Sequence, residues 1–265
     1  MTPEALRDVL EAVAMRAARI GALPDEAEGG PPIGAIFRPV DARMAGVVAD
    51  WVTPVAQRWA PDLDLDPTEL ATVLAQGLAE DRRIDAVEVA PSGLLAITLS
   101  DQARAEIIRS VGHQEATYAL EPPASYVPVE SAAPGSRPAC DQVVRAQRAH
   151  ARMCRLTRNA EAAGVEVREG SRLEELTHVS ERLLLVALAD LPQRLATQAG
   201  DRAQQERALA ELGGLADGWA HPLRPQRLGD PVLPIYGARL ELAQATRIVL
   251  RNGLARLGVA APERM

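Results

Sequence analysis

The second half of the chain, from Asp141 onward, shows one pattern throughout: long stretches with apolar residues at helical spacing, separated by short breaks. Apolar residues at every third or fourth position are typical of helices that bury one face, and Gly or Pro ends such a stretch. The breaks lie at Gly164, Gly170, Gly200, 221–225 (HPLRP) and 229–234 (GDPVLP). We therefore predict that residues 141–265 form an all-α helical-bundle domain that folds by itself.

The first half has a mixed pattern. Two alternating runs within residues 84–100 (IDAVEVAPSGLLAITLS) meet at Pro-Ser-Gly, which predicts a β-hairpin with Gly93 in the positive-φ position. Asp66 and Pro67 precede an apolar periodic stretch, as the N-cap and first turn of a helix do. Residues 1–20 have the pattern of an amphipathic helix. We predict a small N-terminal domain over residues 1–113, with helices and an antiparallel hairpin or sheet.

Residues 114–140 join the two halves. They are rich in Pro, Ala and Ser and have no hydrophobic periodicity, so we predict a linker. The predicted fold class is therefore α+β, with the small N-terminal domain followed by the all-α helical bundle.

The composition is that of a globular protein whose core is built without many aromatic side chains. Hydrophobic residues make up 47% of the 265 residues but aromatic residues only 3%, so Leu, Ala and Val must fill the core. The two cysteines, Cys140 and Cys154, suggest neither a disulfide framework nor a zinc site. The first twenty residues lack the pattern of a signal peptide, and no run reaches membrane-spanning length. We expect a cytoplasmic protein.

Charge is distributed unevenly between the halves. All 29 basic residues are arginine, and lysine is absent. Residues 1–140 hold 11 Arg and 21 acidic residues, whereas residues 141–265 hold 18 Arg and 15 acidic residues. A mildly positive second half is compatible with phosphate binding, although it is weaker than the charge of a general nucleic-acid binder.

Four arginines share one face of the helix predicted to begin at Asp141. At 100° per residue they fall within an arc of roughly 80°, and no acidic residue lies three or four positions from the last three of them. Two interpretations remain open: a solvated charged face, or a surface for an anionic partner such as phosphate. For Arg152, a third interpretation is that it is buried and holds helices together. The four are Arg145, Arg148, Arg152 and Arg155.

The sequence offers no catalytic constellation. The four histidines have no metal-ligand spacing, and no nucleophile motif is present. The GGPPIG stretch at 29–34 cannot act as a P-loop, because that motif needs a lysine. The sequence thus predicts no catalytic residue, no cofactor and no metal site.

Three stretches of the second half resemble the anticodon-binding domain of arginyl-tRNA synthetases, a helical module named after its DALR motif. Residues 147–156 (QRAHARMCRL) resemble its opening helix, usually Gln-Tyr-Ala-His-Ala-Arg-Ile-Cys, and residues 237–259 resemble its last long helix. Residues 260–265 (AAPERM) reproduce the family's terminal residues, which lie near the anticodon in such enzymes.

The first half resembles the N-terminal additional domain of the same family, which contacts the outer corner of tRNA. Ala49-Asp50-Trp51 is similar to the family's Gly-Asp-Tyr or Gly-Asp-Phe. Where the family's hairpin strand usually reads Gly-Phe-Ile-Asn-Phe, residues 93–97 read Gly-Leu-Leu-Ala-Ile.

The resemblance implies a protein that binds tRNA, and arginine tRNA in particular, as a recruiting or regulatory factor. Two alternatives stay open: a tRNA-binding subunit of a split arginyl-tRNA synthetase complex, and a protein-interaction scaffold that has lost RNA binding. The protein partner that the resemblance suggests is a separate synthetase or a tRNA-dependent enzyme. The implied contact residues are the four arginines above together with Tyr236, Arg247, Arg251, Asn252, Glu263, Arg264 and Met265.

Catalysis is not expected from these 265 residues. The family's His-Ile-Gly-His signature is absent, and its Lys-Met-Ser-Lys-Ser counterpart cannot exist without lysine. We therefore expect a non-enzymatic protein.

Overall fold

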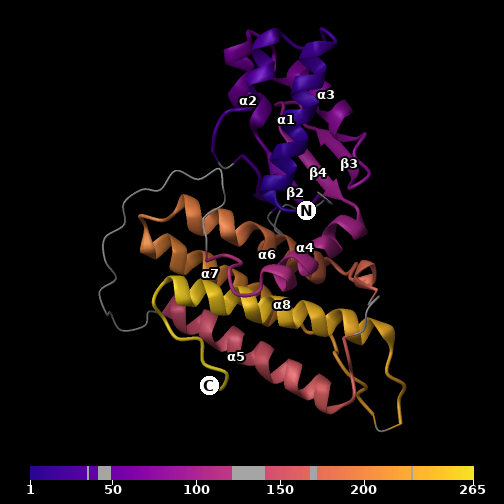
Figure 1. Cartoon of the computed structure of the whole chain (residues 1–265), viewed down its shortest axis with the longest axis vertical. Coiled ribbons are helices and arrows are strands. Elements are labelled where there is room, and N and C mark those ends of the chain that lie inside the picture. The colour runs from indigo at the N-terminus through magenta and orange to yellow at the C-terminus, as the bar shows by residue number, and fades with distance from the viewer. Residues whose placement is uncertain (35, 41–48, 121–140, 168–171, 228) are drawn as a thin grey trace. The chain divides into compact units, whose positions relative to one another are not determined.

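The computed structural model describes residues 1–34, 36–40, 49–120, 141–167, 172–227 and 229–265. The chain divides into two compact units, Met1–Ala103 and Arg104–Met265. The first unit contains helices and a four-stranded antiparallel sheet, and the described part of the second is helical (Figure 1). The predicted α+β fold class is confirmed.

The sheet of the first unit has the strand order β1-β2-β4-β3. Its strands are β1 (Arg38–Pro39), β2 (Trp51–Thr53), β3 (Ile84–Val89) and β4 (Leu95–Leu99), accompanied by the helices α1 (Pro3–Arg19), α2 (Val55–Trp59) and α3 (Pro67–Leu78). β3 and β4 form the predicted hairpin, and Gly93 has a φ of +79°. A Cβ at Gly93 would also lie 2.8 Å from the carbonyl oxygen of Pro67, so glycine is required by both the turn and the packing.

Two aspartates stabilise this unit, and the role of Asp66 was predicted from its local pattern. Asp66 caps α3 by accepting from the backbone N–H groups of Thr68 and Glu69, as expected. Asp50 is buried and accepts from the backbone N–H of Leu99 at 2.7 Å, while the neighbouring Trp51 is fully buried. The Asp50-Trp51 pair therefore joins β2 to β4 and fills the core.

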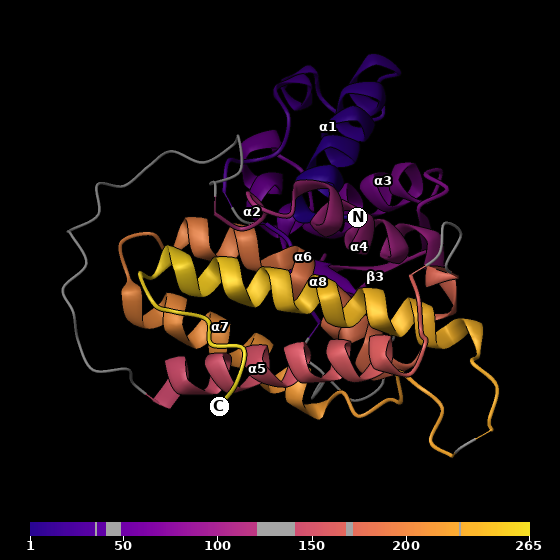
Figure 2. The same cartoon turned by 60° about the horizontal axis from the view of Figure 1, so that its bottom comes forward.

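The second unit is built from α5 (Asp141–Ala162), α6 (Val179–Thr197), α7 (Arg202–Gly218) and α8 (Pro234–Arg256), with α4 (Asp101–Gln114) spanning the division between the units. Figures 1 and 2 show α5 and α8 side by side. Contacts within the unit place Gln244 beside Glu161 and Arg247 beside Cys154, so the two helices run antiparallel. The backbones of α5 and α7 approach closely, because a Cβ at Gly213 would lie 3.3 Å from the Cα of Ala146.

The helix ends follow the predicted glycines. α5 ends shortly before Gly164 and α8 shortly before Gly258, and both glycines have positive φ angles, of 77° and 70°. Leu, Ala and Val make up most of the core, as the composition requires. Burying each large aliphatic side chain stabilises the fold by about 1.5–3 kcal/mol.

The division at Ala103 precedes the domain boundary predicted at residue 113. The reason is that the segment after α4 is bonded to the helical unit. Asn252 on α8 donates through Nδ2 to the carbonyls of Glu115 (2.7 Å) and Tyr118 (2.8 Å), and the Tyr118 hydroxyl donates to the Leu188 carbonyl at 3.1 Å. Residues 114–120, predicted as linker, therefore belong to this unit, and 121–140 lie outside the described residues.

Candidate functional site

Of the four arginines predicted to share one face of α5, three are exposed: Arg145, Arg148 and Arg155. None of them forms an ion pair with a residue that the structure describes. Arg145 extends over α7, since a Cβ at Gly214 would lie 2.8 Å from its Nη2 atom. Arg148 and Arg155 remain on the outer ridge of α5, and we call these two residues the α5 ridge.

Arg152 has a different environment from the other three. Its guanidinium donates to the carbonyls of Ala216 (2.7 Å) and Trp219 (3.0 Å), at the C-terminal end of α7. Burial lowers its pKa, Asp217 opposes that shift, and Arg155 adds to it. Carbonyls at a helix end lack intrahelical partners and carry partial negative charge, so a cation is favourable there. Arg152 thus joins α5 to α7.

The last residues of the chain, 259–265, lie along α5 (Figures 1 and 2), and we call them the C-terminal tail. Gln147 donates through Nε2 to the carbonyl of Ala260 at 2.8 Å. The ring Nδ1 of His150 lies 2.9 Å from the carbonyl oxygen of Pro262, a bond in which the imidazole N–H must donate. Arg158 reaches both the carboxylate and the backbone carbonyl of Glu263, each at 3.4 Å.

The environment of His150 keeps it neutral. Burial lowers its pKa, and the neighbouring Arg247 and Arg251 lower it further, against the bond to Pro262 and the charge of Glu263. The Cys154 thiol lies 3.8 Å from His150 Nε2, and burial raises the pKa of that thiol. A neutral imidazole with its proton on Nδ1 is suited to hold a backbone carbonyl.

The docked tail leaves the side chains of Arg264 and Met265 accessible to a partner, whereas the Glu263 carboxylate is paired with Arg158. Glu263, Arg264 and Met265 are exposed, and Met265 retains 67% of its accessible surface. Around the axis of α5, the ridge lies roughly 60–80° from Arg158, which binds Glu263 at the end of the tail, and roughly 140–160° from His150, which binds Pro262. The α5 ridge and the tail therefore form neighbouring parts of one surface.

The structure separates the remaining predicted contact residues. Arg247 is half-buried beside Cys154, and Arg251 lies 3.8 Å from Glu115. Asn252 is buried and its amide is already bonded to Glu115 and Tyr118, so it has a structural role. Tyr236 lies in the first turn of α8, roughly 20 Å from Arg251 at 1.5 Å of rise per residue.

The residues that bind the tail were not predicted from the sequence as contact residues. Gln147, His150 and Arg158 lie at i, i+3 and i+11 on one stripe of α5, and Cys154, which contacts His150, lies on the same stripe at i+7. This spacing was a usable signal, although nothing local identifies the tail as the segment that covers the stripe.

In the parts of the chain that the structure describes, no group of three or more His, Cys, Asp or Glu side chains is placed to hold a metal ion. None of the helices described combines the length and the apolar character needed to cross a membrane.

The described site is thus a helical unit with a docked C-terminal tail and two exposed arginines on α5, and comparison with known proteins shows which domain it resembles. Residues 146–265 match the DALR anticodon binding domain. This match lies within the helical unit and confirms the resemblance seen in the sequence.

Curated relatives are arginine–tRNA ligases. The ligase of Frankia alni is 43% identical over 123 residues, which are 45% of this chain and 22% of the relative. That of Clavibacter sepedonicus is 35% identical over 175 residues, 64% of this chain and 30% of the relative. That of Kineococcus radiotolerans is 41% identical over 123 residues, again 45% and 22%. The matches thus span less than a third of these relatives.

Proposed function

We propose that this chain binds tRNA, and arginine tRNA in particular, through its DALR anticodon-binding domain. The domain match and the names of the relatives support this class of partner. The observation that carries the proposal is the pair of exposed arginines on the α5 ridge, without acidic partners among the described residues, beside a tail whose terminal side chains are exposed.

The two parts of the surface suit two kinds of contact. Arginine engages phosphate through a planar, permanently charged fork, so Arg148 and Arg155 would bind the RNA backbone, with Arg145 at the margin. The side chains of Arg264 and Met265 would approach bases, because α5 already holds the tail through its backbone and through the Glu263 carboxylate. Arg152 and Asn252 are left out, since their polar groups serve the fold.

The role that follows is recruitment or regulation without aminoacylation by these 265 residues. Lysine is absent from the sequence, and the matched regions are a minor part of each ligase. We expect no ATP–pyrophosphate exchange with arginine from the purified chain, and detectable exchange would contradict this part of the proposal.

The test is a titration of fluorescently labelled arginine tRNA with the full chain, measured by anisotropy at several salt concentrations. A second tRNA with a different anticodon serves as competitor. We expect saturable binding that weakens with salt, because displaced counterions return to the RNA, and a preference for arginine tRNA. Absence of binding to either RNA at low salt would favour the protein-interaction scaffold instead.

A further inference from the structure

Arg158 and Glu263 form an ion pair that links the C-terminal tail to α5. Arg158 Nη1 lies 3.4 Å from the Glu263 carboxylate, and Arg158 Nη2 donates to the backbone carbonyl of the same residue at 3.4 Å. Both side chains remain open to water, with 41% of Arg158 and 71% of Glu263 exposed. An ion pair between exposed side chains contributes little to stability, because water and salt screen it. The Glu263 carboxylate can therefore be exchanged for another anion without loss of the fold.

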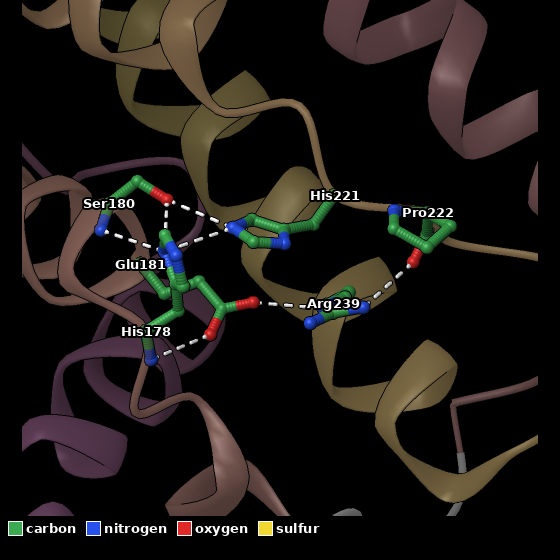
Figure 3. Close-up of polar contacts among 6 residues, drawn as sticks. All are labelled: His178, Ser180, Glu181, His221, Pro222 and Arg239. Atoms are coloured by element: carbon green, nitrogen blue, oxygen red, sulfur yellow. Dashed lines mark hydrogen bonds and ion pairs between the residues drawn. The ribbon is translucent and has the colours of Figure 1, made fainter.

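A second arginine–glutamate pair in the helical unit differs from this one in burial (Figure 3). Arg239 on α8 lies 2.8 Å from Glu181 in the first turn of α6, and the exposed fractions of the two side chains are 15% and 1%. Arg239 also donates to the Pro222 carbonyl. Removal of either partner would leave a buried charge without its counter-ion, so this pair holds helices together. The longer and more exposed Arg158–Glu263 pair has no such role in the core.

Arg158 borders the α5 ridge. It follows Arg155 by three residues, a spacing at which two side chains are neighbours on a helix surface, with Cβ atoms about 5–6 Å apart. Arg155 is exposed and has no acidic partner among the described residues. An RNA backbone that contacts Arg155 would therefore also come within reach of Arg158, whose planar guanidinium suits phosphate.

The acid that neutralises Arg158 comes from the tail, although α5 supplies one that is nearer in sequence. Glu161 follows Arg158 by three residues, the spacing of an intrahelical ion pair, yet it accepts from Gln244 on α8. Glu263 lies 105 positions further along the chain than Arg158. Among the described residues, Arg158 thus depends on the tail for its counter-ion.

The backbone of the tail keeps this carboxylate close to arginines of α5 and α8. His150 binds the carbonyl of Pro262, so the next residue cannot move far from Arg158. Beyond burial, which has the largest effect on the pKa of His150, Arg247 lowers that pKa further and Glu263 raises it, so both charges act on the same ring. A tethered group reaches an effective concentration in the millimolar range. Glu263 therefore competes with any phosphate that approaches Arg158.

We propose that Glu263 is an internal competitor of RNA phosphate at Arg158, and that it limits how strongly the protein binds RNA of any sequence. This inference rests on the proposed function, because the competing anion is a backbone phosphate of the bound tRNA. While Glu263 occupies Arg158, the sequence-independent contacts stay with the ridge arginines, and selection among tRNAs depends on Arg264 and Met265. Replacement of the carboxylate by a neutral amide makes Arg158 available as a further phosphate contact.

The test compares the full chain with Glu263→Gln in the anisotropy titration, using arginine tRNA and the second tRNA in turn. The amide has the shape of the carboxylate and leaves the backbone bonds of the tail in place, so urea denaturation should show unchanged stability. We expect Glu263→Gln to bind both tRNAs up to about fivefold more tightly at low salt, because phosphate no longer displaces an ion pair. Its salt slope should increase in magnitude by about one, so a fourfold rise in salt concentration should weaken its binding about three- to fourfold more than that of the wild type.

Two further variants separate this competition from a general effect of net charge. Glu161→Gln removes the same charge within one turn of Arg158 but breaks no ion pair with an arginine, so its salt slope should equal that of the wild type. In Arg158→Ala, the additional change Glu263→Gln should no longer alter the slope. An unchanged slope in Glu263→Gln while the wild type binds tRNA, an equal effect of Glu161→Gln, or an effect that persists in Arg158→Ala would overturn this proposal alone. Absence of binding by both the wild type and Glu263→Gln would overturn the proposed function as well.

Discussion

Arg152 on α5 donates to the backbone carbonyl of Trp219, 3.0 Å away at the end of α7, and also to that of Ala216. Both carbonyls would lose a charged donor in Arg152→Ala. We expect that change to lower the free energy of unfolding by about 1–3 kcal/mol, measured by urea denaturation of the full chain. Arg155→Ala removes an exposed arginine from the same helix and should change stability by less than about 0.5 kcal/mol. Equal stability of the two variants would contradict the structural role of Arg152.

The α5 ridge should control affinity without controlling specificity. Arg148→Ala and Arg155→Ala should each weaken binding to every tRNA and reduce the magnitude of the salt slope by about one, because one fewer counterion is released. The measurement is anisotropy at four or more salt concentrations. Arg207→Ala, which removes an exposed arginine from α7, is the matched control. If neither ridge variant changes affinity or slope, the ridge is only a solvated face.

The C-terminal tail, in contrast to the α5 ridge, should control which tRNA is preferred. Deleting residues 263–265 removes the exposed side chains but leaves Ala260 and Pro262, which α5 binds. We expect the deletion to narrow the gap between arginine tRNA and its competitor by about 1–3 kcal/mol, the size of a lost base contact. Competition binding measures this gap. A deletion that weakens all tRNAs equally would instead assign the tail to backbone contacts.

Local features of this protein were predictable, whereas partners distant in sequence were not. The hairpin turn at Gly93 and the cap at Asp66 depend on neighbouring residues, and both were identified correctly. Arg152 and Arg155 lie within the same arc of a helical wheel. Only the position of α7 distinguishes them, because Arg152 donates to carbonyls of that helix while Arg155 stays exposed. The same limit hid the partners of His150 and Asn252, which lie more than a hundred residues away along the chain.

His150 provides a test of how the tail is held. Burial lowers its pKa, so the neutral ring stabilises the fold fully above about pH 6.5, and this contribution is lost as the pH falls towards the lower folded value. We expect the unfolding free energy of the wild type to decrease over that range. His150→Asn keeps an amide donor near the position of Nδ1 but cannot titrate, so its pH dependence should be weaker. An unchanged pH profile in His150→Asn would show that the ring does not titrate as its burial requires.

Residues 115–120, which follow α4, should determine whether a fragment that contains the helical unit reaches full stability. Fragments 104–265 and 141–265 differ by residues whose carbonyls accept from Asn252 and whose Tyr118 side chain is buried against the helical unit. We expect the longer fragment to unfold cooperatively and the shorter one to be less stable by several kcal/mol, because apolar surface is exposed and a buried amide loses two acceptors. Asn252→Ala in the longer fragment isolates the amide and should cost about 1–3 kcal/mol. If fragment 141–265 were as stable as fragment 104–265, residues 104–120 would rest on the helical unit without stabilising it, and the boundary predicted from the sequence would be the better one.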